Sequence, residues 1–100
     1  ANLLAAKAPA GEAWNRAYNV ACGSRTSLNE LFVLVREQVA KTHPEAASLE
    51  PVYEAFRPGD IRHSLADITK VSTLLGYAPT HSVRDGLSLA ASWYLNRDRY

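Results

Sequence analysis

Two serine-based capping sequences constrain the fold of this chain more than any other feature. Ser27 and Glu30 have the Ser-x-x-Glu spacing, in which the hydroxyl and the carboxylate each accept a free backbone N–H at the start of a helix. Apolar residues then recur at helical spacing, which predicts a helix over 28–41 that ends before the next proline. Ser82 and Asp85 repeat the capping pattern further along.

Three further helices follow from local signals. The second capping sequence predicts a helix over 83–96, and its apolar residues extend around much of the circumference, so it needs partners on two sides. The Ala- and Leu-rich residues 1–7 favour helix. Asp67 is a natural N-cap for a helix over 68–75, and Gly76 suits the left-handed position that ends it.

Two short segments have the composition of β-strands. Residues 18–22 and 51–57 contain β-forming side chains and are bounded by glycine or by a Pro-Gly turn. The predicted fold class is therefore α+β, with helices packed over a small sheet and residues 1–100 forming one lobe. Two short strands do not make an independently stable sheet. The sequence also opens within what resembles the end of a helix, so we expect the chain to be a fragment of a longer protein.

Charge and composition exclude several classes of function. The chain has 11 basic and 10 acidic side chains, a balance that provides no electrostatic field for nucleic acid. The basic residues are scattered singly, and no apolar run is long enough to span a bilayer, so no membrane partner is expected. The three histidines lack metal-ligand spacing, and the lone Cys22 fits a reducing, cytoplasmic location.

The densest polar cluster follows the second predicted strand. Arg57 can offer a planar pair of donors to a phosphate or a carboxylate, and Asp60 can accept hydrogen bonds from vicinal hydroxyls. Pro58 and Gly59 between them allow the chain to fold back, so the two side chains could face one ligand. The same residues also occur in ordinary solvated turns that hold an ion pair. Spacing alone leaves both interpretations open.

Four stretches in order resemble one family. They are Tyr18–Gly23, Thr26–Phe32, Arg57–Asp67 and Leu74–Pro79. Together they resemble the C-terminal part of the extended short-chain dehydrogenase/reductase family, which comprises NAD-dependent sugar-nucleotide epimerases and dehydratases. Within it, the pattern is most similar to bacterial UDP-N-acetylglucosamine 4-epimerases of polysaccharide biosynthesis.

The resemblance implies three substrate-binding residues. Arg57 would bind the nucleotide diphosphate, Asp60 the ribose hydroxyls, and Ser64 would line the sugar pocket near the 2-substituent. In the family a small residue at the Ser64 position accompanies room for an N-acetyl group, whereas tyrosine accompanies an unacetylated hexose. The implied function is the UDP-sugar-binding portion of an NAD-dependent UDP-N-acetylglucosamine/UDP-N-acetylgalactosamine 4-epimerase. The alternatives are a nucleotide-sugar dehydratase or decarboxylase, and a non-catalytic interaction module.

The chain lacks the parts that the family uses for catalysis. No tyrosine is followed by lysine at the fourth position, and the five glycines never form Gly-x-Gly-x-x-Gly. We therefore assign no catalytic and no cofactor-binding residue here. NAD is expected in the parent enzyme, on an N-terminal Rossmann domain that this sequence does not contain. The isolated chain is predicted to be inactive and, with its contact surface uncovered, to self-associate.

Overall fold

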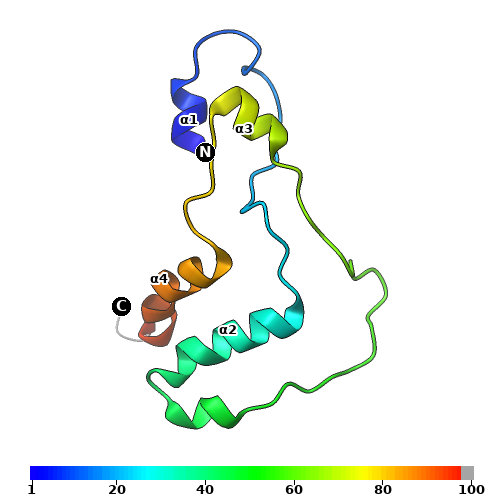
Figure 1. Ribbon diagram of the computed structural model, residues 1–100, viewed down its shortest axis with the longest axis vertical. Helices are drawn as coiled ribbons and strands as arrows, with labels where there is room; N and C mark the ends of the chain where they lie inside the picture. Colours follow the sequence, from blue (N-terminus) through cyan, green and yellow to red (C-terminus); the bar gives the residue numbers. More distant parts are fainter. Residues whose placement is uncertain (98–100) are drawn as a thin grey trace. The chain divides into compact units, whose positions relative to one another are not determined.

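The computed structural model describes residues 1–97 and divides them into two compact units. The helices are α1 (Asn2–Lys7), α2 (Leu28–Ala40), the 3-10 helix η1 (Pro44–Ser48), α3 (Thr69–Leu75) and α4 (Val83–Leu95) (Figure 1). The first unit comprises Ala1–Arg25 and His63–Thr80, and therefore contains α1 and α3; the second contains α2, η1 and α4. In residues 1–97 no helix has the length and apolar character needed to cross a bilayer.

The first unit is organised around α3. Val71 is completely buried, and the helix ends at Gly76, whose φ of 65° is the left-handed conformation expected from the sequence. The helix begins one residue later than predicted, with Ile68 rather than Asp67 at the N-cap position, although the Asp67 carboxylate accepts a hydrogen bond from the backbone N–H of Thr69 at 2.9 Å. The Lys70 ammonium donates to the carbonyl of Ala17, also at 2.9 Å, and so connects α3 to the loop that follows α1.

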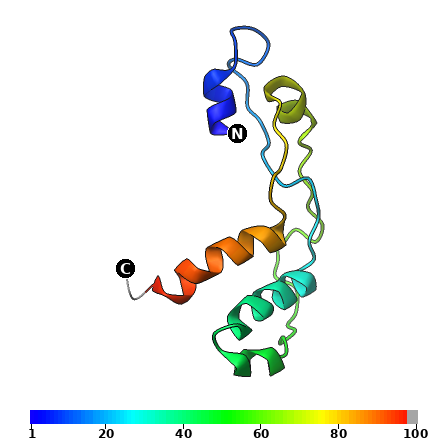
Figure 2. The same cartoon turned by 60° about the vertical axis from the view of Figure 1, so that its left-hand side comes forward.

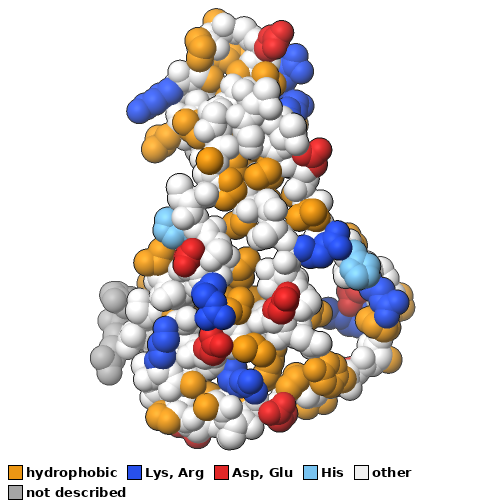
Figure 3. Space-filling view, viewed as in Figure 1, with side chains coloured by type: hydrophobic (Ala, Val, Ile, Leu, Met, Phe, Trp, Pro, Cys, Tyr) orange, Lys and Arg blue, Asp and Glu red, His pale blue; other side chains and the backbone are white. Residues whose placement is uncertain are grey.

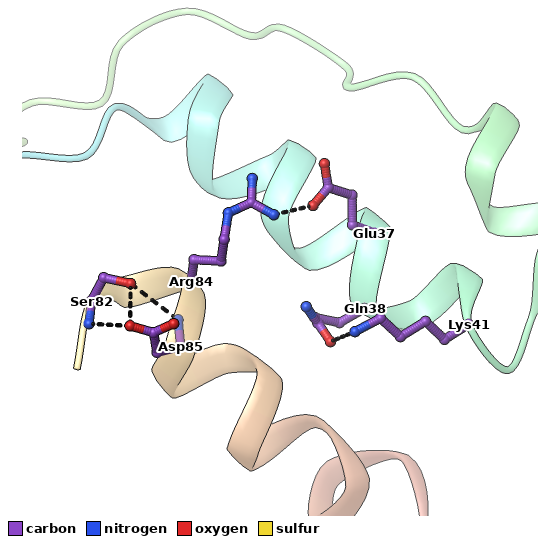
Figure 4. Close-up of polar contacts among 6 residues, drawn as sticks. All are labelled: Glu37, Gln38, Lys41, Ser82, Arg84 and Asp85. Atoms are coloured by element: carbon purple, nitrogen blue, oxygen red, sulfur yellow. Dashed lines mark hydrogen bonds and ion pairs between the residues drawn. The ribbon is translucent and has the colours of Figure 1, made fainter.

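The second unit packs α2 against both η1 and α4, as the views in Figures 1 and 2 show. Both predicted capping boxes are present, so each long helix begins where the sequence indicated. Arg84 of α4 donates to Glu37 of α2 at 2.7 Å (Figure 4). On the same helix Gln38 is buried, and its amide oxygen accepts from Lys41 at 2.7 Å.

The two strand predictions are wrong. Within the described residues neither 18–22 nor 51–57 forms a strand, and no sheet is present, so the α+β expectation fails for residues 1–97. A strand needs a paired neighbour, and the two segments belong to different units. In the first segment a side chain takes the place of a ladder partner, because the Tyr77 hydroxyl donates to the carbonyl of Ala21 at 3.0 Å.

Charged side chains of both signs are interspersed on the face drawn in Figure 3, with hydrophobic side chains exposed among them. The most prominent exposed hydrophobics of α4 are Leu89, Trp93 and Tyr94. One side of α4 contacts α2, whereas these three residues are exposed, so the expectation of a partner on a second side stays a prediction.

Candidate functional site

The candidate site is a turn at the end of an extended segment that is anchored twice to α2. The partly buried Arg36 guanidinium donates to the carbonyl of Leu49 at 2.7 Å, which fixes the start of the segment just after η1. Further along, the Tyr53 hydroxyl donates to the side-chain oxygen of Asn29 at 3.0 Å. These two contacts hold the chain as it approaches the turn at residues 57–60.

The turn brings Arg57 and Asp60 into direct contact. The backbone N–H of Asp60 donates to the carbonyl of Arg57 at 3.3 Å, and Gly59 takes a φ of 86° that suits glycine. The Arg57 Nε donates to the Asp60 Oδ2 at 3.2 Å, with the two side chains 84% and 49% exposed. Exposed ion pairs of this kind contribute roughly 0–1 kcal/mol, so a ligand can replace the contact at little cost.

A second cation lies on the same turn. The guanidinium carbon of Arg62 lies 4.2 Å from the centre of the Phe56 ring, a cation–π contact across the turn. The sequence patterns described above do not predict this pairing. An aromatic residue just before a Pro-Gly turn and an arginine just after it are the only sequence signal for it.

Ser64, the third predicted site residue, lies in the first unit and is exposed, whereas Arg57 and Asp60 lie in the second. The structure thus brings two of the three residues together, and their roles in binding stay predictions. Among residues 1–97 no group of three His, Cys, Asp or Glu side chains could hold a metal ion.

The carboxyl groups with lowered pKa values lie at helix starts rather than at this turn. The Ser27 backbone N–H, and then its hydroxyl, lower the pKa of Glu30. The Ser82 backbone N–H and hydroxyl act in the same way on the pKa of Asp85. Hydrogen bonds from the hydroxyl and then the backbone N–H of Thr69 lower the pKa of Asp67. Local hydrogen bonds at helix starts are the main cause of all three shifts, so the shifts do not indicate catalytic groups.

A separate open pocket of about 380 Å³ lies in the first unit. It is lined by Ala5, Ala6, Ala13, Trp14, Asn15, Arg16 and Tyr18. The Trp14 indole N–H and the Tyr18 hydroxyl already donate to the carbonyls of Ala8 and Ala13, so these two donors have acceptors within the loop. Arg16 and Asn15 are left as the polar side chains of this pocket.

Comparisons with known proteins give relatives of one general kind. The UDP-glucose 4-epimerase of Mycolicibacterium smegmatis is 29% identical over 97 residues, which are 97% of this chain and 28% of that protein. The dTDP-glucose 4,6-dehydratase of Streptomyces griseus is 33% identical over 79 residues, 79% of this chain and 23% of that protein. A relative from Methanocaldococcus jannaschii, provisionally named a UDP-glucose 4-epimerase, is 28% identical over 85 residues, 85% of this chain and 26% of that protein.

No family model matches the chain. The chain spans about a quarter of the length of these curated relatives. Over most of its own length it is similar in sequence to nucleotide-sugar epimerases and dehydratases.

Proposed function

We propose that this chain is the UDP-sugar-binding lobe of a longer NAD-dependent enzyme, a UDP-N-acetylglucosamine/UDP-N-acetylgalactosamine 4-epimerase. The observation that carries the proposal is the turn on which Arg57 and Asp60 meet, in a chain whose relatives are named for reactions of nucleotide sugars. Neither feature suffices alone, because Arg-Asp turns are common and the match covers only 28% and 23% of these two relatives.

The chemistry of the turn suits a nucleoside diphosphate. Arg57 donates to Asp60 only through its Nε, so its terminal N–H groups are available for phosphate oxygens. Once a diphosphate attracts the guanidinium, the Asp60 carboxylate can accept hydrogen bonds from the two ribose hydroxyls. The weak ion pair of the free turn is thereby exchanged for charge-assisted hydrogen bonds to the ligand.

The proposed preference for an N-acetylated sugar rests on Ser64. A serine beside the 2-substituent leaves volume that a tyrosine ring would fill, and an acetamide group needs that volume. The curated relatives are named for UDP-glucose and dTDP-glucose, so the hexosamine preference extends beyond their names.

The residues of this chain do not fit NAD. A dinucleotide site of the usual kind needs a strand, a glycine-rich loop and a helix in succession, and residues 1–97 contain no strand. The open pocket near Trp14 is lined mainly by alanine and aromatic side chains rather than by a glycine-rich loop. In the proposal NAD therefore binds elsewhere in the longer enzyme, and this chain contributes only contacts to the sugar nucleotide.

The test of the proposal is a binding titration with UDP and UDP-N-acetylglucosamine. Arg57→Ala is expected to weaken the binding of both ligands by about 2–3 kcal/mol, the loss typical of a charge-assisted pair. Arg97→Ala is the matched control, because it removes the same charge from an exposed position just after α4. Affinity unchanged by Arg57→Ala would remove the turn from the site.

The isolated chain is expected to show no epimerase turnover. It has no Tyr-x-x-x-Lys pair and no fitting site for the dinucleotide. Incubating the purified chain with UDP-N-acetylglucosamine and NAD, and separating the two epimers by chromatography, measures this directly. Turnover that scales with the amount of chain would contradict the proposal that catalysis belongs to the rest of a longer enzyme.

A dehydratase is the second candidate, favoured by the 33% identity with the Streptomyces griseus enzyme. Dehydration needs an acid and a base near C5 and C6 of the sugar, and we assign no such residues in this chain. The longer enzyme would distinguish the candidates, because a dehydratase releases a 4-keto-6-deoxy sugar that absorbs in alkali, whereas an epimerase releases only the C4 epimer.

A further inference from the structure

We infer that Arg62, stacked on Phe56, is a second diphosphate-binding residue of the turn. This inference rests on the proposed function and extends it to a residue outside the predicted site. Between Phe56 and Arg62 the charged side chains are Arg57, Asp60 and Arg62. Because Arg57 is paired with Asp60, the net positive charge of the free turn comes from Arg62. Arg62 has no acidic partner within the described part of the chain.

The contact with Phe56 prepares Arg62 for this role. A guanidinium held over an aromatic ring by a cation–π contact uses none of its N–H groups as hydrogen-bond donors in that contact. At 4.2 Å from the ring centre the group is restrained by the ring, and within residues 1–97 it forms no ion pair. Phe56 is itself 75% exposed, so the pair lies at the surface, where a ligand can reach it.

The ligand chemistry explains why two cations are useful. A sugar-linked diphosphate carries a negative charge on each phosphate, and a single guanidinium already shared with a carboxylate cannot balance both. In the proposed arrangement Arg57 contacts one phosphate as Asp60 turns to the ribose, and Arg62 contacts the other. A nucleoside monophosphate has only one phosphate and therefore depends less on Arg62.

The experiment compares UDP with UMP, titrated by NMR into the complete chain and into its Arg62→Ala variant. The variant is expected to bind UDP about 10-fold more weakly, as for the loss of one charge-assisted hydrogen bond, with UMP affinity changed less than about 2-fold. Arg62→Lys keeps the charge but not the planar guanidinium, and its affinity for UDP is expected to be about 3-fold lower. Arg97→Ala, the matched loss of charge elsewhere, should leave both ligands unaffected.

The outcomes separate this inference from the proposed function. If Arg62→Ala binds UDP as tightly as the unaltered chain, or if its affinities for UDP and UMP fall equally, the assignment of Arg62 is wrong. If Arg57→Ala still weakens UDP in that case, the proposed function stands without the second cation. A chain that binds no UDP at all overturns both. The exposure of the turn makes unfolding of the variant unexpected, and unchanged NMR signals from α2 and α4 would check this.

Discussion

Under the proposed function, Ser64 determines which sugar nucleotide the enzyme prefers. In the longer enzyme, Ser64→Tyr should lower kcat/KM for UDP-N-acetylglucosamine about 10- to 100-fold more than for UDP-galactose, because the added ring competes with the acetamide for space. Kinetics with the two substrates measure the ratio, and Ser88→Tyr, at an exposed position on α4, is the matched control. Equal losses on both sugars would argue against Ser64 as a pocket residue.

Residue pairs differ in how far the sequence alone could predict them. The contact between Arg57 and Asp60 was predictable, because a Pro-Gly turn fixes the geometry of side chains three positions apart. The stacking of Arg62 on Phe56 was not, because six positions across a turn allow many arrangements. Ser64 follows the same polar stretch yet lies in the other unit, so its neighbourhood could not be deduced from its closeness in sequence.

At the scale of the helices, the capping box of α2 makes stability depend on pH. The pKa of Glu30 in the folded chain lies below its ordinary value of 4.5, owing to the hydrogen bonds from Ser27. The stabilisation is therefore fully present above pH 4.5 and is lost as the pH falls through the lower folded value. Urea unfolding followed by circular dichroism between neutral and strongly acidic pH should show this loss.

The matched variants isolate the cap from the general effect of acid. Glu30→Gln removes the titrating group, so the free energy of unfolding should fall less steeply as the pH becomes acidic. Glu12→Gln removes an exposed carboxyl that belongs to no helix, and its profile should follow that of the unaltered chain. A Glu30→Gln profile as steep as the unaltered one would show that other carboxyls cause the acid sensitivity.

Helices were predictable from this sequence and strands were not, because a helix depends on residues close in sequence whereas a strand depends on a partner far away in sequence. The boundaries of α2 and α4 follow from serine caps within three residues of the partner carboxylate, so the information is local. A strand requires a backbone partner elsewhere. Residues 18–22 and 51–57 have suitable composition but lie in different units, so composition alone gave the wrong answer.

At the scale of the whole chain, burial is sparse within each unit. Among the described residues only Ala46 and Val71 are buried hydrophobics, although 47% of the sequence is hydrophobic. A chain of this length commonly buries roughly 65% of its unfolded surface, and a core of two small side chains falls well short of that expectation. Much apolar surface on both units is thus available to other polypeptides.

The chain on its own is accordingly expected to self-associate, with α4 as the main contact. Leu89, Trp93 and Tyr94 are 68%, 51% and 68% exposed, and burying such side chains against a second copy removes apolar surface from water. Light scattering at increasing concentration should show a rising mean mass, which Leu89→Asp combined with Trp93→Ser should reduce towards that of the monomer. Leu49→Asp, at a similarly exposed leucine after η1, serves as the control. A monomer at every concentration would show that exposure of these side chains does not cause self-association. Equal effects of both sets of substitutions would show that the contact is not centred on α4.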